Sequence, residues 1–355
     1  MGIFIIAEAG VNHNGDPALA RELVNTAVAV GADAVKFQTF QADALVTDAA
    51  PKATYQEGLT NVGQSQLDML RNLELSYDAY HMLARHCASQ NIQFLSTGFD
   101  TASLAFLIDE LDVTSLKIAS GEITNGPLLL QAARSGKDIL LSTGMSNWDD
   151  IDRSLDVLAF GYLEPAKVPT PMALTKLRCS TEGQHALASK VTILQCTTEY
   201  PTPLSEVNLL VMPAMATRFG TRVGISDHTP GTVISIAAAA LGASVIEKHF
   251  TLDRKLPGPD HKASLEPDEL ASMITGIRSV EQALGGSEKH VTKSELANKT
   301  IVRKSLMAAR PIVKGHLLTV NDIAIKRPGG GRSPMEFWSL IGTKAPHNYA
   351  KDEFF

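Results

Sequence analysis

The sequence has few of the features that mark secreted, membrane-bound or nucleic-acid-binding proteins. Its three cysteines, Cys87, Cys179 and Cys196, form no CxxC pair and are too few for a disulfide framework. We therefore expect reduced thiols in a cytoplasmic protein. Lysine and arginine total 32 against 38 acidic residues, a formal net charge of -6. This charge predicts no nucleic-acid partner, and it leaves the attraction of any anionic ligand to a local site.

Long hydrophobic runs are also missing. The longest mostly apolar stretch, residues 233–246, contains Ser235, Gly242 and Ser244 and is too short to cross a bilayer. It predicts a buried helix followed by a buried strand, and we expect no membrane partner. Near the N-terminus, the apolar run that ends at Glu8 has no basic residues before it, so it predicts a strand rather than a signal peptide.

Several common catalytic signatures are not found. The sequence has no P-loop, no Gly-x-Ser-x-Gly elbow and no Ser-His-Asp order, and no lysine stands out as a Schiff-base nucleophile. No G-x-G-x-x-G motif follows the first predicted strand. These absences argue against a nucleotide-binding open sheet and against a serine hydrolase.

The sequence does contain a regular alternation of short apolar runs and longer amphipathic segments. The short runs are continuously apolar, which is typical of strands covered on both faces. We predict strands at Ile3–Glu8, Ala34–Gln38, Gln93–Thr97, Ser115–Ile118, Asp138–Ser142, Val191–Cys196, Arg222–Ile225 and Ser244–His249. Helical patterns follow at Pro17–Val30, Tyr77–Gln90, Thr101–Leu111, Pro127–Ser135, Trp148–Phe160, Glu206–Arg218, Thr232–Leu241 and Pro267–Leu284. This order predicts a (β/α)₈ TIM barrel, with a doubly wound open sheet as the alternative.

The composition changes after the eighth predicted helix. We predict a catalytic barrel over residues 1–285, a linker over residues 286–299 and a small β-rich domain over residues 300–355. A domain of that size is marginally stable alone, so we expect it to pack on the barrel or on a partner subunit. Within the barrel, we predict a long polar loop at Phe40–Gln64 and a partly mobile insertion at Gly161–Lys190.

Polar side chains recur where the predicted strands end, and barrel active sites lie at these carboxyl ends. Two lysines and several hydroxyl groups would suit an anion that carries phosphate and carboxylate groups. Any one of these residues alone is better explained by a solvated strand end or a helix cap, but their recurrence on most strands favours a site. The candidates are Lys36, Thr97, Lys117, Ser120, Ser142, Tyr200 and Ser226.

Two histidines close the last two predicted strands. His228 and His249 lie one βα unit apart, so both imidazoles could reach one divalent cation such as Mn²⁺. The alternative is a pair of ordinary core or surface histidines. His13 is either a third contributor or a residue that orders its loop.

Three carboxylates, Glu8, Glu122 and Asp260, stand at the same predicted rim. Each could act as a general acid or base. Alternatively, each could form a structural ion pair with Lys36 or Lys117.

Specific motifs extend this general barrel pattern. They are EAGVNHNG at residues 8–15, VKFQT at 35–39, LKIASGE at 116–122, LSTGM at 141–145, CTTEYP at 196–201, GISDHT at 224–229, EKHFT at 247–251 and PGPDH at 257–261. Together they resemble the bacterial N-acetylneuraminate (sialic acid) synthase family, which includes the legionaminate and pseudaminate synthases. The C-terminal segment with Lys326-Arg327-Pro328-Gly329 resembles the small antifreeze-like (SAF) domain of that family.

The resemblance implies a role for each matching residue. Phosphoenolpyruvate would be bound by Lys36, Thr97, Lys117, Ser120, Ser142 and Ser226. A divalent metal, most often Mn²⁺ with Mg²⁺ or Co²⁺ as alternatives, would be held by His228 and His249. The resemblance assigns Glu8, Glu122 and Asp260 to the active site, and Tyr200 to the sugar pocket. It also implies a domain-swapped homodimer in which Arg327 of one subunit reaches the barrel of the other.

The activity implied is that of a nonulosonic acid synthase, a transferase that joins phosphoenolpyruvate to an N-acetylated amino sugar with C–C bond formation and C–O cleavage. N-acetylmannosamine, which would give N-acetylneuraminate and phosphate, is the first expectation. The alternative is 2,4-diacetamido-2,4,6-trideoxymannose, which would give N,N'-diacetyllegionaminate. Thr198 and Gly98 depart from the residues of many sialic acid synthases, so the choice of sugar stays open. A lysine-imine aldolase and a non-catalytic binding protein are more distant alternatives.

Overall fold

The computed structural model describes residues 2–52 and 65–355. The chain divides into two compact units, Met1–Gly285 and Gly286–Phe355. Residues 53–64 of the predicted loop Phe40–Gln64 lie outside the described residues, and the described part of this loop begins with a short helix, α2 (Ala42–Leu45).

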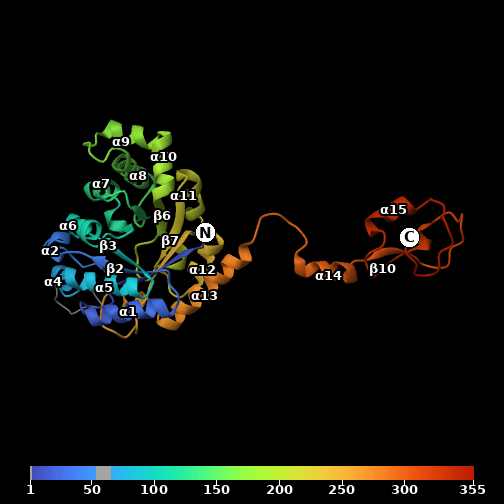
Figure 1. Cartoon of the computed structure of the whole chain (residues 1–355), viewed down its shortest axis with the longest axis horizontal. Coiled ribbons are helices and arrows are strands. Elements are labelled where there is room, and N and C mark those ends of the chain that lie inside the picture. The colour runs from blue at the N-terminus through green and yellow to red at the C-terminus, as the bar shows by residue number, and fades with distance from the viewer. Residues whose placement is uncertain (1, 53–64) are drawn as a thin grey trace. The chain divides into compact units, whose positions relative to one another are not determined.

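The first unit is a closed barrel of eight parallel strands surrounded by helices (Figure 1), which confirms the predicted fold. The strands are β1 (Phe4–Gly10), β2 (Ala34–Thr39), β3 (Gln93–Gly98), β4 (Ser115–Ile118), β5 (Asp138–Ser142), β6 (Val191–Cys196), β7 (Arg222–Asp227) and β8 (Val245–His249). Its other helices are α1 (Pro17–Ala29), α4 (Gln66–Arg71), α5 (Tyr77–Ser89), α6 (Thr101–Ala105), α7 (Gly126–Arg134), α8 (Trp148–Leu163), α9 (Pro171–Arg178), α10 (Thr181–Lys190), α11 (Val211–Phe219), α12 (Val233–Ala240) and α13 (Pro267–Leu284).

Local sequence explains where the helices begin. The side chains of Asp16, Ser76 and Asn125 each accept a hydrogen bond from a backbone N–H in the first turn of the following helix. Proline occupies the first turn of α1, α7 and α13, where its fixed φ suits the helix and its missing N–H costs nothing. These caps place each helix directly after the loop at the carboxyl end of a strand.

Strand register arranges the barrel interior in layers. The lower layer is an apolar cluster of Ile6, Ala34, Leu95, Leu140, Leu194 and Val245. Directly above it, Glu8 is paired in register with Lys36 of β2 on one side and with His249 of β8 on the other. Because side chains alternate along a strand, residues two apart point the same way, and a charged layer therefore lies on the apolar one.

The predicted insertion at Gly161–Lys190 is largely helical. Helix α8 continues to Leu163, and α9 and α10 occupy most of the rest. Thr170 and Ser180 cap the two added helices. Arg178 forms ion pairs with Asp152 and Asp156 of α8. Capping and ion pairing therefore hold this insertion on the barrel.

The second unit has a small core around a two-stranded antiparallel sheet of β9 (Ser305–Ala308) and β10 (Ile323–Lys326). Its core residues are Leu306, Ala308, Ile312, Leu318, Ile323, Leu340, Ala345 and Tyr349. The predicted linker 286–299 is partly helical, because α14 (Lys293–Val302) begins inside it at a capping box formed by Thr292 and Glu295. A short helix, α15 (Phe337–Leu340), packs beside the sheet core.

Gly224 of β7 is a position where the barrel wall leaves no room for a side chain. A Cβ at this residue would lie 2.2 Å from the Val245 carbonyl oxygen and 2.9 Å from a methyl group of Leu194. We predict that Gly224→Ala destabilises the barrel by about 1–3 kcal/mol, since the strands must move apart. Thermal melting measures this loss. Gly126→Ala is the control, because no atom lies within 4 Å of its added Cβ. Equal melting temperatures for the two variants would contradict the close strand packing.

Candidate active site

A cavity of about 230 Å³ opens at the carboxyl ends of the barrel strands. It brings together most of the residues predicted from the sequence. They are Glu8, Lys36, Thr97, Lys117, Ser120, Ser142, Tyr200, Ser226, His228, His249 and Asp260. Residues far apart in the chain, such as Lys36 and Ser226, thus line one space, as barrel topology predicts.

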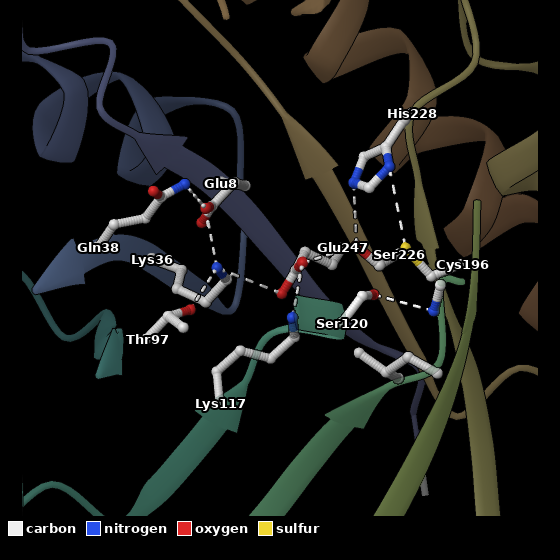
Figure 2. Close-up of polar contacts among 12 residues, drawn as sticks. Glu8, Lys36, Gln38, Thr97, Lys117, Ser120, Cys196, Ser226, His228 and Glu247 are labelled. Carbon is white, nitrogen blue, oxygen red and sulfur yellow. Dashed lines mark hydrogen bonds and ion pairs between the residues drawn. The ribbon is translucent and has the colours of Figure 1, made fainter. Parts of the chain in front are cut away.

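The base of the cavity is a buried layer of two lysines and two glutamates (Figure 2). Lys36 Nζ lies 2.8 Å from Glu8 Oε1 and 3.7 Å from Glu247 Oε2. Lys117 Nζ lies 3.4 Å from Glu247 Oε1. All four side chains are at most 5% exposed. The positive charges therefore share a single network with both carboxylates.

Glu247 is the central residue that the sequence reading missed. The Ser226 hydroxyl donates to Glu247 Oε1 at 2.7 Å, so this carboxylate joins β7 to both lysines. The signal for it was present in the sequence, because Glu247 stands two residues before His249 on the same strand and must face the same side. Two lysines pointing into a barrel also require a buried counter-charge.

The two glutamates in this layer have opposite pKa shifts. Burial opposes ionisation of Glu247, but the ammonium groups of Lys117 and Lys36 outweigh it and lower the pKa of Glu247 to about 2. Burial raises the pKa of Glu8 to about 7, although the Lys36 ammonium group opposes this effect. Glu247 is therefore a permanent anion at neutral pH, while Glu8 is poised to gain or lose a proton.

Hydroxyl groups line the side of the cavity near β4 to β6. The backbone N–H of Gly144 donates to Ser120 Oγ at 2.9 Å, which fixes the Ser120 side chain. Ser142 Oγ and Thr198 Oγ1 are buried and have no hydrogen-bond partner among the described residues. Buried polar atoms are seldom left unpaired, so these hydroxyls suit a water molecule or a ligand in the cavity.

Three aromatic rings meet at the ends of β6, β7 and β8. The ring centroids of His228 and His249 are 5.4 Å apart, and the Tyr200 ring lies 4.1 Å from that of His228. His228 Nδ1 donates a hydrogen bond to the Thr197 carbonyl oxygen, at 2.8 Å. In the neutral ring, the lone electron pair therefore lies on Nε2.

The two histidines fit a divalent metal. Burial lowers the pKa of His249 well below its usual value, so this ring is neutral and able to coordinate. Its Nδ1 is buried without a hydrogen-bond partner in the described part of the chain. No group of three or more His, Cys, Asp or Glu side chains among the described residues is placed to hold a metal. A cation bound here would therefore take its remaining ligands from water or substrate.

Asp260 lies at the cavity edge on the loop after β8. Burial raises the pKa of its carboxyl group to about 6. A hydrogen-bond chain fixes this loop, because the Asn12 amide donates to Ser264 Oγ at 2.9 Å and Ser264 Oγ donates to the Asp260 carbonyl oxygen at 2.7 Å. His13 is fully buried outside the cavity lining, in the same N-terminal loop as Asn12.

Two further predicted residues, besides His13, are not among those that line the cavity. Glu122 accepts a hydrogen bond from the Asn125 amide at 2.7 Å, next to the first turn of α7. Arg327 lies in the second unit, just after β10.

No helix among the described residues is long and apolar enough to cross a membrane.

Comparisons with known proteins give full-length relatives of this chain. The chain is 46% identical to the N,N'-diacetyllegionaminic acid synthase of Campylobacter jejuni over 98% of this chain and 97% of that protein. It is 41% identical to the enzyme of the same name from Legionella pneumophila, over 98% and 92% of the two chains. The human N-acetylneuraminate-9-phosphate synthase is 32% identical over 99% and 90%.

A solved structure shows the same architecture. The N-acetylneuraminic acid (sialic acid) synthetase of Leptospira borgpetersenii, in complex with citrate, is 30% identical, with a TM-score of 0.67 over 84% of this chain and 90% of that one. The profile of the NeuB family matches residues 23–289. With its barrel, its cavity and these full-length relatives, the chain belongs to the NeuB family of nonulosonic acid synthases.

Proposed function

We propose that the protein condenses phosphoenolpyruvate with 2,4-diacetamido-2,4,6-trideoxymannose to give N,N'-diacetyllegionaminate and phosphate. The observation that carries this proposal is the buried Lys36–Glu8–Glu247–Lys117 layer beneath two neighbouring histidines. It combines a site for a small anion with a site for a cation in one cavity.

The lysines and hydroxyls would hold phosphoenolpyruvate. Lys36, Lys117 and the hydroxyls of Thr97, Ser142 and Ser226 all line the base of the cavity. Such donors match a phosphate and a carboxylate group, and fixing both groups aligns C3 of the enol with the second reactant. A new C–C bond would form between C3 and the aldehyde carbon, water would add at C2, and phosphate would leave by C–O cleavage.

Glu8 is our candidate for proton transfer. Its pKa of about 7 matches the optimum for a general acid or base near neutral pH. Glu8 Oε2 is buried and has no hydrogen-bond partner among the described residues, so it is free to act on a bound reactant. Glu122 is a weaker candidate, since its carboxylate is bound by Asn125 away from the cavity lining.

A divalent metal, for which Mn²⁺ is our first choice, would be held by His228 and His249. When bound, it would act as a Lewis acid that polarises the aldehyde of the open-chain sugar. Tyr200 packs against both imidazole rings and would hold them in place.

The choice of sugar differs from the first expectation. The sequence reading placed N-acetylmannosamine first, whereas the relatives with the highest identity given above are both N,N'-diacetyllegionaminic acid synthases. We therefore propose the diacetamido sugar, and N-acetylmannosamine becomes the alternative.

Charge supports a homodimer in which the second unit reaches a partner's barrel. Residues 286–355 carry a net charge of +6, whereas residues 1–285 carry -12. Complementary charge favours association between units of opposite sign. Arg327, in the basic unit, would then be placed to meet an anionic reactant.

Phosphate release tests the proposed reaction. We expect release that requires both phosphoenolpyruvate and the diacetamido sugar, that stops with a metal chelator and that returns with Mn²⁺. His249→Ala should lose turnover and Mn²⁺ binding while keeping its melting temperature, since the buried Nδ1 of this ring has no hydrogen-bond partner among the described residues. Covalent trapping of a lysine by borohydride with pyruvate, without phosphate release, would instead support the imine aldolase.

The counter-charge role of Glu247 gives a further prediction. Glu247→Gln leaves two buried ammonium groups with only Glu8, which should destabilise the barrel by about 3 kcal/mol. Inorganic phosphate should then raise the melting temperature of the variant more than that of the unchanged protein, because the lysines bind the added anion more tightly. Glu199→Gln, at an exposed glutamate on the β6 loop, is the control. An unchanged response to phosphate would refute this role for Glu247.

A further inference from the structure

The cavity has two chemically different sides. Its base and the β4–β8 side carry the charged and hydroxyl groups described above. The side above β1 to β3 is mostly apolar. Among the described residues that line it, the one polar side chain beyond the charged layer and Thr97 is Gln38 of β2, whose amide donates to Glu8 Oε1 at 3.4 Å. The remainder is formed by Val11, Met69, Leu70, Leu73 and Phe99, which we call the apolar wall.

The apolar wall lies above the charged layer. Val11 and Phe99 each follow the carboxyl end of a strand, β1 and β3 respectively, whereas Lys36 and Lys117 stand within strands. The other wall residues come from α4 and the two positions that follow it. A reactant that extends from the histidines or lysines towards the cavity mouth would therefore meet this wall.

The wall is a packed structure. Met69 and Leu73 are 4% and 7% exposed and form a cluster with Val11 and Phe40. The Phe40 and Phe99 rings meet edge to face, with centroids 6.3 Å apart.

Two further contacts fix α4 in place. Arg71 at its end is ion-paired with Asp43 of α2. Gly15 lies so close to the residue after α4 that a Cβ there would be 2.5 Å from the Asn72 carbonyl oxygen. The wall is thus held rigidly enough to discriminate between ligands.

We propose that the apolar wall selects amino sugars whose sixth carbon is a methyl group over sugars that carry a hydroxyl group there. The inference rests on the proposed function, which places the aldehyde end of the sugar at His228 and His249 and directs the other end to the mouth. A methyl group would be buried against Leu70 and its neighbours. A hydroxyl group in the same place would lose its hydrogen bonds to water and find no partner on the wall.

The test uses two sugars that differ at one position. One is 2,4-diacetamido-2,4,6-trideoxymannose, and the other is 2,4-diacetamido-2,4-dideoxymannose, which retains the 6-hydroxyl group. We expect kcat/KM for the 6-methyl sugar to be about 10- to 100-fold higher, the range in which an apolar pocket rejects an added hydroxyl group. The difference should lie mainly in KM, because the contact is remote from the reacting carbon.

Substitution of the wall locates the source of the preference. Leu70 is half-buried, so Leu70→Asn introduces a polar group at the cavity with less risk to folding than a change at Met69. We expect this variant to bring the ratio of kcat/KM values towards one, chiefly by improving KM for the 6-hydroxy sugar. Leu210→Asn is the matched control, because Leu210 is 75% exposed outside the cavity lining and should leave the ratio unchanged.

The outcomes separate this inference from the proposed function. Equal kcat/KM values for the two sugars in the unchanged protein, with phosphate released from both, would overturn the selection by the wall and leave the reaction standing. A preference that persists fully in Leu70→Asn would also overturn it. Release of phosphate with neither sugar would overturn the proposed function, and the inference with it.

Discussion

The buried pairing of two lysines with two glutamates inside the barrel is the constraint on which the site depends. Four charges at this depth are tolerated only when they neutralise one another and satisfy their hydrogen bonds. Glu247 is the main counter-charge, since it forms ion pairs with both Lys36 and Lys117 and accepts a hydrogen bond from the Ser226 hydroxyl. The network is electrically balanced when both acids are ionised, and an arriving anion must compete with the glutamates. That competition favours protonation of Glu8, whose pKa is already raised.

The strand and helix pattern predicted most of this architecture, because continuous apolar runs and helix caps are local signals. The boundaries of β4, β5, β6 and α13 match the predicted ranges, and the barrel brings together residues predicted from the ends of eight strands. Barrel topology brings these residues together although they are far apart in the sequence. The same logic could not place Glu122, because a glutamate three residues before a helix cap finds a local partner in Asn125.

Other features depended on tertiary contacts that a single sequence does not display. The insertion Gly161–Lys190 has weak helix signals of its own. Its Arg178 forms ion pairs with Asp152 and Asp156 of α8, which precede the insertion in the chain. The apolar wall likewise combines Val11, Phe99 and α4, segments that are separated by whole strands and helices. Strand alternation also predicts the position of Glu247, because it stands two residues before His249 on the same strand and faces the same side.

The cavity is divided into a charged base and an apolar wall, so it can bind two reactants of different polarity side by side. In the proposed reaction, a strongly anionic reactant and a methyl-bearing sugar would need opposite surroundings, although their reacting carbons must meet. In this barrel the strands supply the charged layer, whose register is fixed by the ladder between β1, β2 and β8. The loops beyond the strand ends supply the wall, and they can vary without disturbing that register. If the wall selects the sugar as we propose, this selection can change by substitution at the wall while the lysines, glutamates and histidines beneath it remain as they are.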